Sequence, residues 1–216
     1  MTKTNTTNRT YKTNNLIPPH GGYKNLEAYK MAVIIYDAAL AFCNLYMTYR
    51  TNKTNKSYRT YDQMVQAARS GKQNIAEASL ASATSKKTEL KLIGVSRASF
   101  QELLEDLEDF LRQKGLRLWR KDSTEAQTIR RLAYNPNKSY MTYKPYIENK
   151  NPEIAANTLI CLIHQTSFLL DQLLRRLEKD FLEKGGFTER LYQKRKEKRD
   201  DRTNKTYETY KTKENY

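Results

Sequence analysis

The sequence has few of the residues on which folds rich in turns depend. Seven glycines and five prolines in 216 residues are few for a β-sandwich or a β-barrel, and this composition suits helices. Its two cysteines, Cys43 and Cys161, lie inside apolar runs with helical spacing. Cysteine is among the most buried residue types, so we interpret both as reduced core thiols of a cytosolic protein.

Residues that usually carry catalysis or bind metals are also scarce. The two histidines, His20 and His164, do not stand at a metal-ligand spacing from the cysteines. The chain has no nucleotide-binding loop, no nucleophile elbow and no Glu-x-x-His motif of the kind that di-metal helix bundles use. The sequence therefore predicts a protein that is not an enzyme and that needs no cofactor or metal.

Long apolar runs are missing as well. No run approaches about 18 apolar residues, the length that a membrane-spanning helix needs. The N-terminus, MTKTNTTNRT, lacks the apolar region of a secretory signal. We expect no membrane segment and a cytoplasmic location.

What the chain has in excess is positive charge, with a net charge of +15. Four segments together carry +14 of this net charge: residues 1–24, 47–61, 134–146 and 182–216. Most of the residues in these segments are Tyr, Thr, Asn, Lys or Arg. The stretch YMTYRTNKTNKSYRTY at residues 46–61 is typical. Such segments hold too few aliphatic residues to bury a core. We expect disorder in the tail at 1–21 and in insertions at 47–61 and 134–146. In the basic suffix and tail at 186–216, Thr188 can cap a short helix.

The remaining residues form four blocks with apolar side chains every three or four positions, at 25–46, 62–81, 86–115 and 151–186. Asp62 is a predicted N-cap of the second block, and Asn151 with Pro152 begins the fourth. Gly115 is a predicted stop for the third. The pattern predicts an all-α fold, an antiparallel up-down-up-down four-helix bundle over residues 22–185.

One charged residue falls inside an apolar stripe. Arg97 stands between Ile93 and Phe100 in the third block. A buried guanidinium is costly unless it is paired. We therefore expect a structural polar cluster that fixes the register of the bundle, made of Asn74, Glu77, Arg97 and Glu102.

The second and third blocks also carry a recognisable motif. Its elements are Gln63, Ala67-Ala68, Ser70, Asn74-Ile75-Ala76-Glu77, Ser85-Lys86-Lys87, Glu89, Arg97, Ser99, Glu102 and Gly115, with Tyr23-Lys24-Asn25-Leu26 as an opening. This pattern resembles the bacterial four-helix-bundle family encoded in intervening sequences of large-subunit ribosomal RNA genes. That family includes the accessory variability proteins (Avd) of diversity-generating retroelements. The resemblance covers residues 22–181, and the C-terminal suffix is typical of a subgroup.

The resemblance implies a protein without enzymatic activity. Avd proteins form basic pentameric rings that bind nucleic acid and a reverse transcriptase. By resemblance we expect a homo-oligomer, RNA or DNA as a ligand and a reverse transcriptase as a partner. The alternative is a structural or protein-interaction bundle with solubilising basic tails.

Several basic residues outside the low-complexity segments could follow a phosphate backbone, which requires positive charge but no special geometry. The candidate nucleic-acid-binding residues are Arg69, Lys72, Lys86, Lys87, Lys91, Arg117, Arg120, Lys121, Arg130 and Arg131. A solvated surface is the alternative interpretation of each.

Overall fold

The computed structural model describes residues 21–47 and 56–213, and every regular element in these ranges is helical. A 3₁₀ turn, η1 (Tyr23–Asn25), precedes seven α-helices. These are α1 (Glu27–Tyr46), α2 (Lys56–Ala81), α3 (Lys86–Gln113), α4 (Thr124–Leu132), α5 (Tyr140–Ile147), α6 (Pro152–Lys184) and α7 (Phe187–Lys213). The predicted all-α class is confirmed, whereas the predicted number of helices is too small.

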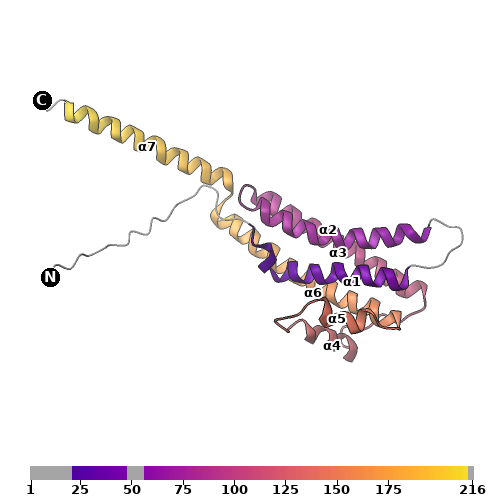
Figure 1. Cartoon of the computed structure of the whole chain (residues 1–216). Coiled ribbons are helices and arrows are strands. Elements are labelled where there is room, and N and C mark those ends of the chain that lie inside the picture. Colours follow the sequence, from indigo (N-terminus) through magenta and orange to yellow (C-terminus); the bar gives the residue numbers. More distant parts are fainter. Residues whose placement is uncertain (1–20, 48–55, 214–216) are drawn as a thin grey trace, which may run out of the picture.

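Four of these helices are long and pack side by side. α1 contacts α2 and α6, and α3 also contacts α2 and α6 (Figure 1). The shared core is made of fully buried side chains from all four, such as Ile35, Met64, Leu107 and Leu162. The short helices α4 and α5 pack on α6, and α5 also contacts α1.

Contacts at both ends of the long helices show how these ends meet. Gly21 donates its N–H to the carbonyl oxygen of Ser79, so the start of α1 lies near the end of α2. At the other end, the Tyr61 hydroxyl donates to Asn44 Oδ1 at 2.9 Å, which joins the start of α2 to the end of α1. The Tyr46 hydroxyl donates to the carbonyl oxygen of Asn149, just before α6.

Helix boundaries follow from local capping. Ser85 Oγ accepts the N–H of Thr88 at 3.1 Å and begins α3. Asn151 Oδ1 accepts the N–H of Glu153, with Pro152 as the first residue of α6, as predicted. Gly115, after α3, has φ +65°, which glycine adopts more easily than other residues. Asp62 is not an N-cap, because α2 begins six residues earlier, at Lys56.

α2 and α3 approach each other closely at Gly71. A methyl group placed on Gly71 would lie 2.6 Å from the ring of Phe100, so only glycine leaves room for this aromatic side chain. Ser96 Oγ donates to the carbonyl oxygen of Gly71 at 2.7 Å. The predicted apolar stripe of α2 is buried, since Ala68, Ile75 and Ala78 have no exposed surface.

The prediction of a disordered insertion at 134–146 is wrong. Its second half forms α5, in which Tyr143 and Ile147 are fully buried. Ser139 begins this helix with a capping box, because Thr142 Oγ1 also accepts the N–H of Ser139. The low-complexity composition of the segment hid one core side chain, Tyr143, and a good helix start.

The predicted insertion at 47–61 is also partly helical, and the helix in the basic suffix is longer than predicted. Lys56–Tyr61 belongs to α2, and Tyr61 packs against the core. Residues 187–213 form α7, which points away from the other helices (Figure 1). The predicted N-terminal tail at 1–20 and insertion residues 48–55 lie outside the described residues.

Both cysteines are free and buried, in agreement with the prediction of core thiols. Burial raises the pKa of Cys43 to about 12 and that of Cys161 to about 11. Two helical stretches, Glu27–Tyr46 and Pro152–Thr203, are long and apolar enough to cross a membrane by length and composition alone. Half or more of each apolar window is buried inside the protein, as in core helices.

Candidate nucleic-acid interface

The predicted phosphate-binding residues fall into two separate groups. Arg69 and Lys72 lie on α2, and Lys86, Lys87 and Lys91 lie in the first turns of α3. The others follow α3, in the connection to α4 and in α4 itself: Arg117, Arg120, Lys121, Arg130 and Arg131.

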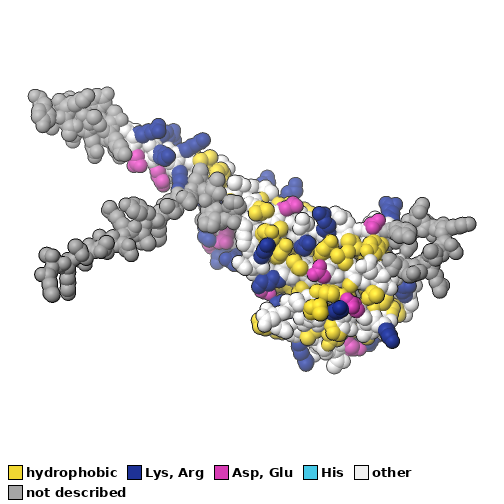
Figure 2. All heavy atoms as spheres, viewed as in Figure 1, with side chains coloured by type: hydrophobic (Ala, Val, Ile, Leu, Met, Phe, Trp, Pro, Cys, Tyr) yellow, Lys and Arg dark blue, Asp and Glu magenta, His cyan; other side chains and the backbone are white. Residues whose placement is uncertain are grey.

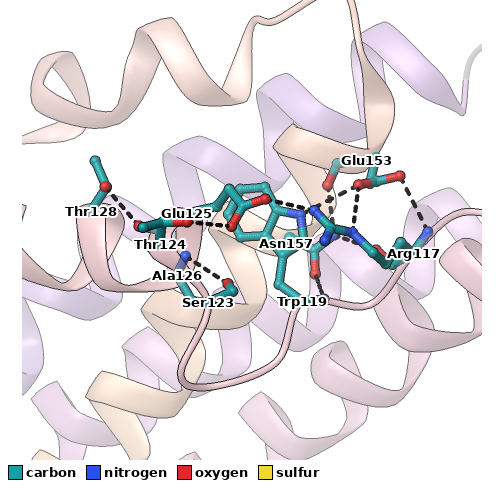
Figure 3. Close-up of polar contacts among 9 residues, drawn as sticks. All are labelled: Arg117, Trp119, Ser123, Thr124, Glu125, Ala126, Thr128, Glu153 and Asn157. Atoms are coloured by element: carbon teal, nitrogen blue, oxygen red, sulfur yellow. Dashed lines mark hydrogen bonds and ion pairs between the residues drawn. The ribbon is translucent and has the colours of Figure 1, made fainter.

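Arg117 in the second group is held by carboxylates. Its guanidinium lies 2.6 Å from Glu125 Oε1 and 3.5 Å from Glu153 Oε1 (Figure 3). The hydrogen bond to Glu125, and then the charge of Glu153, raise the pKa of Arg117 above its ordinary value. Two carboxylates compensate this one positive charge, which leaves little of it for a phosphate.

Asn157 fixes the backbone beside Arg117. This buried residue donates from Nδ2 to the carbonyl oxygen of Arg117 at 2.8 Å and accepts the N–H of Trp119 at Oδ1, also at 2.8 Å (Figure 3). The two hydrogen bonds tie the connection after α3 to α6. Arg117 therefore belongs to a structural network, and its interpretation as a phosphate ligand is not supported by this geometry.

The remaining residues of this group differ in their pairing. Arg120 lies 3.2 Å from Asp122 Oδ1. Arg130 donates from Nη1 to the carbonyl oxygen of Lys121 at 2.6 Å, which closes the loop before α4. Lys121 and Arg131 have exposed side chains and form no ion pair within residues 21–47 and 59–203.

On α2 and α3, too, some of the predicted phosphate-binding residues contact other side chains and some do not. The Lys72 ammonium lies 4.1 Å from the centre of the Tyr36 ring, in a cation–π contact with α1. Lys86 pairs with Glu89 at 2.7 Å, and both side chains are largely buried. Arg69, Lys87 and Lys91 are exposed and lack a carboxylate partner in the part of the chain that the structure describes.

The structure brings the start of α3 next to the end of α6. The carboxylate of Asp180 has a lowered pKa, chiefly through its hydrogen bond with Lys184 and further through the charges of Arg176 and Lys86. Arg190 of α7 donates to the carbonyl oxygen of Ala83, in the corner between α2 and α3, at 3.5 Å. The start of α3 and the junction between α6 and α7, which are distant in sequence, thus meet at one end of the molecule.

This end of the molecule is rich in cations, and we call it the basic end. It consists of Lys86, Lys87, Lys91, Arg175, Arg176, Lys184 and Arg190. The sequence continues from Arg190 into QKRKEKR at residues 193–199, on α7. Figure 2 shows Lys and Arg side chains along the described part of α7. Periodicity did not single out Arg175, Arg176 or Arg190, because basic residues near the end of an amphipathic helix are usually only solvated.

The predicted polar cluster around Arg97 is wrong in its members. Arg97 is 55% exposed and pairs with Asp171 Oδ1 of α6 at 3.0 Å. Glu77 and Glu102 are exposed, and Asn74 donates to Ser70 within α2. A long side chain at the edge of an apolar stripe can extend its charged group into solvent. Arg97 therefore does not have to enter the core, although it stands in line with Ile93 and Phe100. The polar contacts between α2 and α3 are instead Ser70 with Ser99 at 3.0 Å and Ser96 with Gly71.

The opposite end of α2 and α3 carries negative charge. A groove of about 890 Å³ between the two helices is lined by Arg59 and by the carboxylates of Asp62, Glu102, Glu105 and Asp106. Burial, and then the charges of Asp109, Glu102 and Glu105, raise the pKa of Asp106. This surface repels phosphates, in contrast to the basic end.

Among the described residues, no group of three or more His, Cys, Asp or Glu side chains is arranged to hold a metal ion. Comparison of the chain with known protein families, with curated proteins and with solved structures finds no match.

Proposed function

We propose that this protein is a non-enzymatic RNA-binding accessory protein that works as an oligomeric scaffold, as its resemblance to the Avd-like family implies. In this proposal α1, α2, α3 and α6 form the antiparallel four-helix bundle of that family. The hydrogen bonds that join successive helix ends agree with alternating directions.

The observation that carries the proposal is the basic end. Lys87, Lys91 and Arg176 are exposed there and have no carboxylate partner within the described part of the chain. Cations that form no ion pair can release the counterions of a phosphate backbone, which is the main source of non-specific affinity. The paired cations Arg117 and Arg120 lack this property.

Charge reversal on the full-length chain tests the proposal. A variant with Lys87→Glu, Lys91→Glu and Arg176→Glu should bind a single-stranded RNA oligonucleotide at least about tenfold more weakly at low salt, with a smaller salt dependence. The matched control is Arg112→Glu with Lys114→Glu and Lys144→Glu. It reverses three cations outside the basic end, of which Arg112 and Lys144 already pair with carboxylates and Lys114 lies over the Phe110 ring.

The result that overturns the proposal is the absence of RNA binding by the unmodified chain at about 50 mM salt, where electrostatic binding is strong. Equal losses in the test variant and in the control would show that net charge, and not the basic end, determines affinity.

The oligomeric part of the proposal rests on the family resemblance, which implies a pentamer and a reverse transcriptase as partner. Light scattering at micromolar concentration should give a mass several times that of the 25.4 kDa chain. If the measured mass is that of a monomer, the oligomeric part of the proposal is wrong. RNA binding is then tested by the titration alone. Co-purification with a reverse transcriptase encoded beside the gene tests the partner.

A second candidate function is a protein-interaction bundle, which the acidic groove favours. Its four carboxylates and single guanidinium suit a cationic peptide. In this case Glu102→Gln with Glu105→Gln would weaken capture of a basic peptide, and the RNA titration would show no binding.

A further inference from the structure

A second hollow shares no lining residue with the basic end or with the acidic groove. It has a volume of about 480 Å³ and is bounded by α1, by α6 and by the connection between α4 and α5. Its lining combines the apolar side chains of Met31 and Leu169 with Tyr134, His164 and Phe168. Figure 2 shows hydrophobic side chains across the face that α1 and α5 form.

Three aromatic side chains stand open to solvent around this hollow. Tyr134 is 87% exposed and Phe168 is 60% exposed, while His164 is exposed too. His164 and Phe168 are four residues apart on α6, so they lie on the same face of that helix. Exposed apolar surface that is gathered in one place often marks a binding site.

The floor of the hollow also carries a polar group that lacks a partner. Gln165 donates from Nε2 to the carbonyl oxygen of Arg130 at 3.2 Å, which fixes the orientation of its amide. Its Oε1 is buried and has no hydrogen-bond partner among the described residues. A buried acceptor without a partner costs free energy, so a movement of this side chain that gives the oxygen a partner is favourable.

Cations lie close to the aromatic side chains. Arg130 and Lys138 line the hollow, and Arg131 is the next residue on α4. Lys138 is already paired with Glu27 at 2.8 Å. Arg131 and Lys121 are exposed and have no carboxylate partner in the described ranges, and the Arg130 guanidinium holds the Lys121 backbone beside α4.

We infer that this hollow, between α1, α4 and α6, receives an unpaired base of single-stranded RNA. The base stacks on Tyr134 and Phe168, and the neighbouring phosphates lie against Lys121 and Arg131. Flat aromatic side chains beside a positively charged surface are the usual way in which proteins bind single strands, since every base has a face to stack. The bases of a duplex are already stacked and cannot enter. The inference rests on the proposed RNA-binding function and names its substrate class.

The test uses the full-length chain and an RNA oligonucleotide that carries one 2-aminopurine, whose fluorescence changes when it stacks on a protein. One sample is single-stranded and the other is the fully paired duplex. Tyr134→Ala with Phe168→Ala should lower the affinity for the single strand by roughly 5- to 150-fold, the range found for removal of a stacking side chain. The affinity for the duplex should stay the same.

Leu45→Ala with Leu118→Ala is the matched control, because both side chains are exposed and neither lines this hollow. Circular dichroism of all variants checks that the helices are intact. Lys121→Glu with Arg131→Glu should lower the affinity for the single strand and leave the stacking signal of the remaining bound fraction unchanged.

Two results contradict the inference in different ways. If the unmodified chain binds single strand and duplex equally and the aromatic variant binds as well as the control, the hollow does not hold a base, but the proposed RNA-binding function stands. If the unmodified chain binds neither RNA at about 50 mM salt, the proposed function itself fails and the inference fails with it.

Discussion

The carbonyl oxygen of Gly71 accepts a hydrogen bond from the hydroxyl of Ser96, and the ring of Phe100 covers the same glycine. One turn of α2 thus makes both a close apolar contact and a buried polar contact with α3. Because a helical carbonyl already accepts from its own helix, the serine uses the second lone pair of this oxygen.

Gly71→Ala should therefore destabilise the protein. The added methyl group would lie 2.6 Å from the Phe100 ring, so the two helices have to separate. Overpacking of this kind costs about 1–3 kcal/mol, measured as a fall in the free energy of unfolding by urea. Gly94→Ala is the control, because a methyl group there meets no atom within 4 Å. It should leave the protein unchanged or stabilise it by up to about 1 kcal/mol, since alanine favours helix.

Tyr143 allows a test of the finding that the segment 134–146 is part of the core. Tyr143→Ala should cost about 3–5 kcal/mol, as truncations of large buried side chains do. Tyr143→Phe should cost little or be slightly stabilising, because the buried hydroxyl has no partner among the described residues. If Tyr143→Ala unfolds at the same urea concentration as the unmodified protein, this segment does not contribute to the stability of the core.

Asn157→Ala should loosen the connection after α3. It leaves the N–H of Trp119 and the carbonyl oxygen of Arg117 without their partner, at a cost of about 1–3 kcal/mol. Trp119 is the single tryptophan of the chain, so its fluorescence reports this change directly. We expect a red-shifted emission in the variant. Arg120→Ala removes only an exposed ion pair and should shift neither the emission nor the stability measurably.

The two cysteines predict a dependence of stability on pH. Burial raises the pKa of Cys43 to about 12 and that of Cys161 to about 11, from an ordinary thiol value near 9. The unfolded chain loses these protons at a lower pH than the folded chain does. The free energy of unfolding is thus unaffected below pH 9 and falls as the pH rises from 9 towards 11 and 12.

The same burial protects both thiols from reagents. At pH 8 they should react with a thiol reagent only as fast as the protein unfolds, and at once in denaturant. Rapid reaction of the folded chain would contradict the buried positions. A Cys43→Ser Cys161→Ser variant should show a weaker fall in stability between pH 9 and 11 than the unmodified chain.

The sequence was sufficient for the elements whose signals are local and repeated. Apolar spacing predicted the four long helices, and Asn151 with Pro152 predicted the start of α6. The start of α2 was missed because Lys56–Tyr61 is polar and repetitive, and only a contact with Asn44 of α1 reveals that Tyr61 packs inwards.

The candidate site was less predictable. Whether a surface cation is free depends on neighbours from other elements, as Arg117 shows with Glu125 and Glu153. Arg97 had the position of a core residue but pairs with Asp171, which lies 74 residues further along the chain. The hollow around Tyr134 and Phe168 joins three elements, so no sequence window contains it.

The burial of Tyr143 bears on how freely this gene can change its length. Short repeats gain and lose copies by slippage during replication, and most copies in a coding sequence are expected to vary without consequence. The low-complexity segment that forms α5 is different. One residue added between Ser139 and Tyr143 would rotate the Tyr143 side chain by about 100° around the helix axis. Tyr143 would then leave the core and a polar neighbour would enter it. Selection should hold the length of this segment constant among related strains.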